Sequence, residues 1–192
     1  MSIKKTIGKL GLKLGGWKTV NKTPEGLGNA VCIVAPHTAI ADFLVGLCYY
    51  WYYDMKFKVM IKKEMFKPVL GWLLKKVGAI PVNRGHQNHL VEQMVDMFSK
   101  NKDTHLIICP EGTRKKVKHW KKGFYVIAEG AHLPIALGFI DYKKKLCSLE
   151  KVIYPSGDYD KDLAEIWDYY RSRKVMGKHP ELFNLYDEYE KD

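Results

Sequence analysis

Hydrophobic residues along the chain follow two alternating patterns. A continuous apolar run occurs at residues 30–35 (AVCIVA) and a mainly apolar one at residues 104–109 (THLIIC), and such runs are typical of strands that are covered on both faces. In residues 87–99, by contrast, apolar side chains recur every three or four positions, which is the period of an amphipathic helix. The two patterns succeed one another along the chain and therefore predict alternating strands and helices.

The alternation extends over most of the sequence and indicates an α/β fold with a largely parallel or mixed sheet flanked by helices. The strands are predicted at residues 30–35, 57–61, 79–82, 104–109, 134–142 and 149–154. The helices that accompany them are predicted at residues 42–53, 64–77, 87–99, 123–130 and 160–176. Because no repeat, low-complexity tract or linker interrupts this order, we expect one domain over residues 17–192.

The preceding segment, residues 1–16, has the pattern of a short basic amphipathic helix. Its apolar residues stand at helical spacing and are Ile3, Ile7, Leu10 and Leu14, while lysines occupy positions 4, 5, 9 and 13. Such a helix can lie in a membrane interface with its lysines against anionic headgroups, or it can pack on the core of its own domain. Several glycines weaken the helix prediction in either case.

Composition limits the class of protein. The chain has 192 residues, 46% of them hydrophobic, which is enough for one domain with a real core, and its net charge of +11 favours an anionic partner. A membrane-spanning helix needs about 20 consecutive apolar residues, whereas the richest stretch covers only residues 43–53. No secretory signal is visible either, so we expect a cytoplasmic or peripheral membrane protein.

The four cysteines, Cys32, Cys48, Cys109 and Cys147, are far apart and lack the spacing of metal ligands. We therefore predict no metal site. Cys32 and Cys109 fall in strand-like runs and are expected to be reduced core residues. Cys109 directly precedes Pro110 and Glu111, so a nucleophilic role stays open as a minor alternative.

The first candidate for chemistry is the pair His37 and Asp42. His37 follows the predicted strand 30–35 by two residues, and the loop after a buried strand is where α/β folds place their sites. If Asp42 lies in the first turn of the next helix, the chain can curl so that the carboxylate meets one imidazole nitrogen. That contact would fix the tautomer of His37 and stabilise its imidazolium, as a general base requires. A loop histidine next to a helix cap is the alternative interpretation.

A second candidate stands at residues 110–114 (PEGTR), also directly after a buried strand. Gly112 allows close approach of the backbone, Thr113 offers a hydroxyl and an amide, and Arg114 offers a bidentate fork for a phosphate. Glu111 could bind an acceptor hydroxyl or hold Arg114 in place. Between the two candidates, the predicted strand 79–82 leads to Arg84, a second guanidinium suited to a phosphomonoester.

These segments resemble, in the same order, the motifs of the glycerolipid acyltransferase family, which includes the 1-acyl-glycerol-3-phosphate acyltransferases. The family is marked by a His-x4-Asp box, a glycine-containing segment that ends in Arg, a Glu-Gly-Thr-Arg box and a Pro-Ile segment. The corresponding segments of this chain are residues 37–42, 78–84, 111–114 and 133–137. The chain departs from the pattern at Pro36, where a polar residue commonly precedes the histidine, and at Leu137, where a second proline is usual.

The resemblance implies an acyltransferase domain over residues 17–192 that moves a fatty acyl group from acyl-CoA or acyl-carrier protein to a lysophospholipid, without a cofactor. It implies that His37 is the general base, that Asp42 orients it, and that Arg84 with residues 111–114 binds the acceptor phosphate. The expected location is peripheral, on the cytoplasmic face of an anionic membrane, with segment 1–16 in place of the longer helical anchor of many relatives.

Two alternatives remain open at this level. The acceptor could be another lysolipid, such as an amino-acid-based one, or the chain could bind anionic lipid without catalysis. Nucleic acid is not an expected partner, because the basic residues are spread along the chain and no nucleic-acid-binding motif is present. The densest basic run, residues 114–122, adjoins the candidate phosphate site and suits an anionic lipid, the CoA phosphates or an acidic carrier protein.

Overall fold

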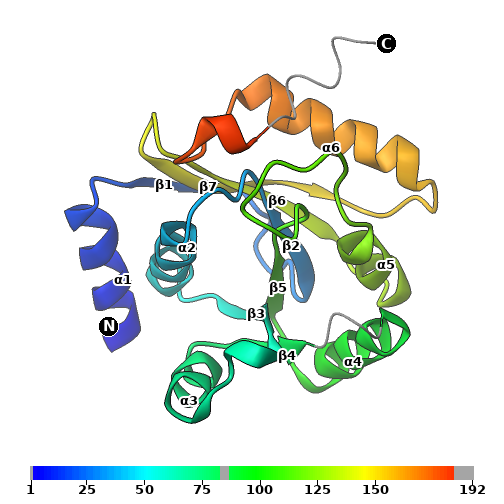
Figure 1. The fold of residues 1–192 in the computed structure, drawn as a ribbon, viewed down its shortest axis with the longest axis horizontal. Helices are drawn as coiled ribbons and strands as arrows, with labels where there is room; N and C mark the ends of the chain where they lie inside the picture. Colours follow the sequence, from blue (N-terminus) through cyan, green and yellow to red (C-terminus); the bar gives the residue numbers. More distant parts are fainter. Residues whose placement is uncertain (1, 83–86, 184–192) are drawn as a thin grey trace.

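A mixed β-sheet forms the centre of the molecule (Figure 1). In the computed structural model, the described residues are 2–82 and 87–183, with side chains described for 2–82 and 90–183, and within them the sheet has seven strands in the order β1-β7-β6-β2-β5-β3-β4. The strands are β1 (Lys18–Asn21), β2 (Ala30–Val34), β3 (Lys56–Lys62), β4 (Ala79–Val82), β5 (Thr104–Ile108), β6 (Ile135–Asp141) and β7 (Leu146–Ile153).

Strand direction places the loops that carry the sequence motifs. Strand β2 runs parallel to both of its neighbours, β5 and β6, and β3 runs parallel to β5 and β4. The carboxyl ends of these five strands therefore lie at one edge of the sheet. Only β7, which pairs antiparallel with β6, and β1, which is parallel to β7, run the other way. The predicted α/β fold with a mixed sheet is confirmed.

Helices cover both faces of the sheet (Figure 1). They are α1 (Ile3–Leu14), α2 (Ala41–Tyr52), α3 (Pro68–Lys76), α4 (Gln87–Lys100), α5 (Gly123–Gly130) and α6 (Tyr159–Arg173), with the 3₁₀ turns η1 (Lys63–Met65) and η2 (Pro180–Leu182). Successive side chains of a strand point to opposite faces. Val31 and Ile33 of β2 accordingly pack with α4, α5 and α6, while Ala30 and Cys32 pack with α1 and α2.

The predicted elements and the structure differ clearly at two places. The helix predicted over residues 64–77 is wrong in its first turn, because α3 begins only at Pro68. Proline disfavours helical conformation in the residue before it, and Lys67 is indeed extended, with φ −65° and ψ 157°. Strand β1 was not predicted, since it is short, lies at the edge of the sheet and lacks a strong alternation of apolar residues.

Helix α1 packs closely on α2 through Gly8. A Cβ atom on Gly8 would lie 2.6 Å from the carbonyl oxygen of Cys48, so glycine allows the two helices to approach closely.

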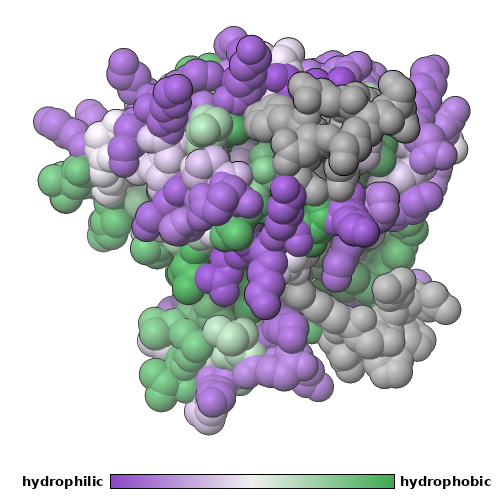
Figure 2. Space-filling model, turned by 45° about the horizontal axis from the view of Figure 1, so that its top comes forward, coloured by the Kyte–Doolittle hydropathy of each residue, from purple (hydrophilic) through white to green (hydrophobic). Residues whose placement is uncertain are grey.

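Gly8 and Leu12 are the buried residues of α1, whereas its other large apolar side chains are exposed: Ile3, Ile7, Leu10 and Leu14. Figure 2 shows hydrophobic side chains on this side of the surface. Within the described ranges, no helix has both the length and the hydrophobicity to cross a bilayer.

Candidate active site

The loops after β2 and β5 meet at the carboxyl edge of the sheet. These strands are hydrogen-bonded neighbours, so residues far apart in sequence come together there. The backbone N–H of His37 donates a hydrogen bond to Oε1 of Glu111, 74 residues further along the chain, at 3.0 Å. The sheet thus joins the two segments that the sequence identified separately.

The side chain of Asp42 holds the imidazole of His37 and the loop between them. Asp42 lies in the first turn of α2, and its Oδ2 is 3.0 Å from Nδ1 of His37. The same oxygen accepts hydrogen bonds from the backbone N–H groups of Thr38 at 3.0 Å and Ala39 at 2.9 Å. Since Nδ1 of His37 is engaged, its Nε2 is the nitrogen left to exchange a proton with a substrate.

The other carboxylate oxygen of Asp42, Oδ1, accepts a hydrogen bond from the hydroxyl of Tyr142 at 2.7 Å. Burial alone would raise the pKa of Asp42, but the hydrogen bonds from His37, Ala39 and Tyr142 outweigh burial and lower it. Asp42 is therefore a carboxylate at neutral pH. A buried anion of this kind is a suitable partner for an imidazole that becomes protonated during a reaction.

The environment of His37 favours its charged form. Burial opposes the imidazolium, but the hydrogen bond with Asp42 and the adjacent Cys109 side chain together raise the pKa of His37. A base must be unprotonated to accept a proton, so this shift predicts that reactivity increases as the pH rises through the pKa of His37. The raised pKa also means that the surroundings of His37 stabilise its imidazolium once it has formed.

Glu111 contacts the His37 backbone rather than Arg114. Its side chain is only 4% exposed, and its Oε2 accepts no hydrogen bond from the described residues. Burial raises the pKa of Glu111 to about 7. The glutamate therefore supports the loop that carries His37, an arrangement that neither of the two roles predicted for Glu111 anticipates.

The raised pKa of Glu111 has a consequence for stability. Its ordinary pKa is 4.5, so the folded protein binds more protons than the unfolded chain between pH 4.5 and 7. The contribution of Glu111 to the free energy of unfolding should therefore fall as the pH rises through this window, by up to about 3 kcal/mol, and level off above it. We expect Glu111→Gln to remove this slope, as measured by urea unfolding at pH 5 and pH 8.

The matched control is Glu129→Gln, which replaces an exposed glutamate on α5 and should keep the wild-type slope. An unchanged slope in Glu111→Gln would show that Glu111 does not titrate in this range.

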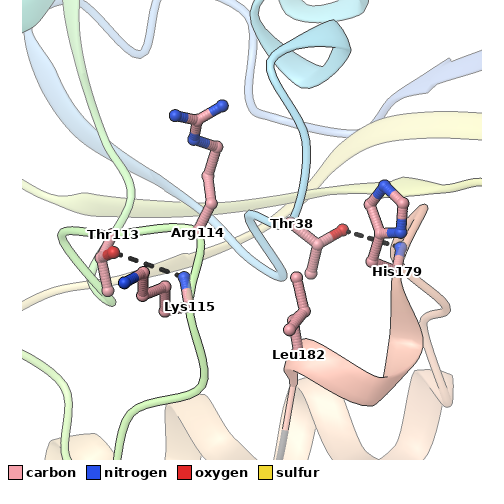
Figure 3. A pocket seen from close by; sticks show the side chains of 6 residues that line it. All are labelled: Thr38, Thr113, Arg114, Lys115, His179 and Leu182. Atoms are coloured by element: carbon pink, nitrogen blue, oxygen red, sulfur yellow. Dashed lines mark hydrogen bonds between the residues drawn. The ribbon is translucent and has the colours of Figure 1, made fainter.

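A cavity of about 350 Å³ opens beside this pair of loops (Figure 3). It is lined by Thr38, Thr113, Arg114, Lys115, His179 and Leu182. The Thr113 hydroxyl accepts a hydrogen bond from the backbone N–H of Lys115 at 3.3 Å, which shapes the turn that follows. Arg114 and Lys115 are exposed and cationic, so the cavity can receive an anionic group such as a phosphate.

The backbone conformation of Gly112 favours glycine. It has a positive φ of 64°, and a Cβ at this position would lie 2.9 Å from Cε of Lys121. The backbone N–H of Gly112 also donates a hydrogen bond to the carbonyl of Cys109 at 2.9 Å. The glycine thus allows a tight turn directly after β5, from which Thr113 and Arg114 reach the cavity.

The sequence did not identify two contributors to the site. Tyr142 follows β6, whose carboxyl end shares the edge with β2, so strand order could have identified it. His179 and Leu182 come from the segment after α6, which returns over the site: the N–H of His179 donates a hydrogen bond to Oγ1 of Thr38 at 3.1 Å. No sequence signal connects that segment with residues 37–42.

The other two motif segments contribute none of their described residues to this cluster. Arg84 lies outside the described residues. The segment 133–137 forms the amino end of β6, at the opposite edge of the sheet, where Ile135, Ala136 and Leu137 are fully buried. Among described residues, no group of three or more His, Cys, Asp or Glu side chains is arranged to hold a metal ion.

Cys109 lies next to His37, although no histidine is near it in the sequence. Burial raises the pKa of the Cys109 thiol, against the lowering influence of His37. A nucleophilic cysteine needs a readily formed thiolate, so this environment does not favour the nucleophilic alternative.

Comparisons with known proteins identify a family and a similar solved structure. The sequence model of a family described as Acyltransferase matches residues 18–137, which span all four motif segments. Comparison with the sequences of curated proteins gives no match. Among solved structures, the chain is similar to the 1-acyl-sn-glycerophosphate (LPA) acyltransferase PlsC from Thermotoga maritima, with a TM-score of 0.60 and 15% identity. The similarity covers 90% of this chain and 77% of that one.

Proposed function

Because the chain belongs to the Acyltransferase family, we propose that it transfers a fatty acyl group from a thioester donor to the hydroxyl of a lysophospholipid. The observation that carries this proposal is the His37–Asp42 pair, held next to a cavity with Arg114 and Lys115 at its wall. A base beside a cationic pocket suits an acceptor that has both a hydroxyl and a phosphate. An acceptor such as 1-acyl-glycerol-3-phosphate combines the two.

In the proposed reaction, Nε2 of His37 takes the proton of the acceptor hydroxyl as its oxygen attacks the thioester carbonyl. Asp42 stabilises the imidazolium through the 3.0 Å contact with Nδ1. The tetrahedral intermediate then collapses with loss of the thiolate, which takes up the proton from His37. The products are an ester and a free thiol, and no metal, cofactor or covalent enzyme intermediate is needed.

The anionic end of the acceptor would bind in the cavity. Arg114 offers a bidentate fork, and Lys115 and the Thr113 hydroxyl lie on the same wall. We assign Glu111 to positioning of the His37 loop and Gly112 to the turn that presents Thr113 and Arg114. Arg84 is proposed as a second cation for the phosphate on the strength of the sequence motif alone.

The donor is proposed to be acyl-CoA or acyl-carrier protein, since both are thioesters. The exposed basic run 114–122 next to the site suits the phosphates of CoA or the acidic surface of a carrier protein.

We also propose that the protein acts at the cytoplasmic face of a membrane, with α1 in the interface. The exposed Ile3, Ile7, Leu10 and Leu14 and the four lysines of this helix support that position.

The decisive test is the release of free thiol from a long-chain acyl-CoA, with and without lysophosphatidate. Release that depends on the acceptor, together with formation of the diacyl product, would support the proposed reaction. If acyl-CoA and acyl-carrier protein both fail to react with lysophosphatidate and with other lysolipids, the proposal is wrong.

Replacement of Arg114 with alanine tests the phosphate site. We expect the KM for a phosphate-bearing acceptor to rise by about 10- to 100-fold with a smaller change in kcat, because a charge-assisted contact with the acceptor is lost. Steady-state kinetics with varied lysophosphatidate would measure this effect. The control Lys118→Ala removes another exposed cation of the same run, outside the cavity lining. An equal loss with a phosphate-free acceptor would contradict phosphate recognition by Arg114.

A further inference from the structure

Exposed large hydrophobic side chains are concentrated in three segments of the described chain. All of them except Val126 and Tyr154 lie on α1, on the turn that begins α2, or on the segment from Met65 to the middle of α3. Scattered single hydrophobic residues are normal on a protein surface, but contiguous apolar patches mark interaction sites. The clustering of these exposed hydrophobic side chains therefore indicates an interaction surface rather than ordinary surface composition.

Helix α3 is the most pronounced case. Gly71 is its one buried residue, pressed against the backbone of Phe66, while Val69 is 76% and Trp72 is 56% exposed. Leu70 and Leu73 are exposed as well. A surface helix normally turns its apolar stripe toward the core. Helix α3 instead turns most of its apolar side chains outward.

Chain topology places α3 on the same face of the sheet as α1 and α2. Parallel strands joined through a helix form right-handed crossovers, and the order β2-β5-β3-β4 moves in one direction from β2 through α2 to β3 and from β3 through α3 to β4. Figure 1 shows the three helices on one side of the sheet, and Figure 2 shows hydrophobic side chains over this side.

The turn that carries the candidate base also contributes to this surface. Ile40, which stands between His37 and Asp42 in sequence, is 68% exposed, and Leu44 on the next turn of α2 is exposed too. The outer side of the His37–Asp42 loop is thus apolar, whereas its inner side holds the hydrogen bonds of Asp42.

The charge around these hydrophobic residues is strongly positive. Residues 1–16 and 56–76 together contain eleven lysines and a single acidic residue, Glu64. Lys76 places its ammonium 3.7 Å from the ring centroid of Trp72, and tryptophan with lysine is the combination preferred at a membrane–water interface. Apolar side chains within a dense set of cations complement an anionic phospholipid surface, which offers acyl chains beneath negative headgroups.

We propose that α3, together with the turn at Ile40 and Leu44 and with α1, forms a docking face for an anionic phospholipid bilayer. This inference rests on the proposed function, which needs a lipid acceptor, and deepens it by naming the surface that meets the lipid. Val69 and Trp72 enter the interface, while the surrounding lysines contact the headgroups. Because the turn at Ile40 belongs to the His37 loop, docking brings His37 to the membrane interface, where a lysophospholipid lies.

The test is co-sedimentation of the whole 192-residue chain with extruded vesicles of phosphatidylcholine and phosphatidylglycerol. The double variant Val69→Gln/Trp72→Gln removes the two most exposed apolar side chains of α3. The matched control, Val126→Gln/Tyr154→Gln, also replaces one aliphatic and one aromatic exposed residue, but outside the proposed face. All four positions are exposed, so both variants should keep the wild-type circular dichroism spectrum.

We expect the α3 variant to bind vesicles at least roughly tenfold more weakly than the wild type, and the control to bind like the wild type. Wild-type binding should also weaken as salt is raised, because the lysine contribution is screened. Equal binding by the wild type and the α3 variant would overturn the proposal, as would an equal loss in the control. The proposal would also fall if the wild type self-associates without vesicles and the α3 variant is monomeric, since the face would then be a contact between two copies.

A second measurement separates this proposal from the proposed reaction. Acyl transfer between short-chain, monomeric substrates in solution needs no bilayer, so the α3 variant should keep the wild-type rate. Vesicle binding that is lost in the α3 variant, without any transfer by the wild type, would support the docking face and refute the reaction. If the wild type transfers acyl groups in solution and the α3 variant still binds vesicles like the wild type, the reaction is supported and the docking face is refuted.

Discussion

Acyl transfer by the His37→Ala variant is expected to fall by about 10³-fold or more. The substitution removes the only nitrogen proposed to take the proton of the acceptor hydroxyl, and general-base catalysis contributes about 10²- to 10⁴-fold. Thiol release from acyl-CoA at saturating acceptor measures the loss in kcat. Binding of the acceptor should change little, because the proposed phosphate contacts come from Thr113, Arg114 and Lys115 on the neighbouring loop.

The control for this variant is His132→Ala, which removes an exposed histidine just after α5, outside the basic run and the cavity lining. It should retain wild-type activity, and both variants should keep the wild-type circular dichroism spectrum. Full activity in His37→Ala would rule out His37 as the base.

The Asp42→Asn variant should lose about 10²- to 10⁴-fold in kcat/KM and should also change its pH dependence. Asparagine has nearly the same shape as aspartate but carries no charge, so it no longer stabilises the imidazolium or fixes the tautomer of His37. In the wild type, Asp42 contributes to the raised pKa of His37. Activity requires unprotonated His37, and its acidic limb should therefore lie at lower pH in Asp42→Asn than in the wild type.

The measurement is kcat/KM over a range of pH, which reports the ionisation of the free enzyme. Asp96→Asn is the matched control: Asp96 is an exposed aspartate of α4 that pairs with Lys100, and its replacement should move neither the rate nor the limb. A reduced rate with an unmoved acidic limb would mean that Asp42 acts by holding Thr38 and Ala39 rather than through its charge.

Local patterns predicted most of the fold. The mainly apolar runs at residues 30–35 and 104–109 became the central strands β2 and β5, because a strand covered on both faces is apolar along most of its length. Prediction failed where a local signal was misread or weak. Pro68 begins α3, whereas the predicted helix has it in its interior. Strand β1 is short and mostly polar, so no hydrophobic pattern marks it.

For the candidate site, the sequence identified residues but not all of their contacts. The spacing of His37 and Asp42 predicted a contact that the structure has, because five residues suffice for the chain to curl back from a helix start. Glu111 was identified but its contact was not: it supports the His37 loop from a buried position instead of pairing with Arg114. The roles of these residues in catalysis remain predictions.

The sequence by itself determined the order of strands and helices and the chemical groups available for a reaction, because these follow from local periodicity and from residue types. The resemblance of its motif segments to those of known acyltransferases indicated the family. Only the tertiary structure decided which distant groups meet. Pairing of β2 with β5 brought Glu111 to His37, the parallel strand β6 delivered Tyr142 to Asp42, and the return of the chain after α6 placed His179 against Thr38. It also decided that the apolar residues of α3 face outward, since burial depends on what packs against a helix and not on its own sequence.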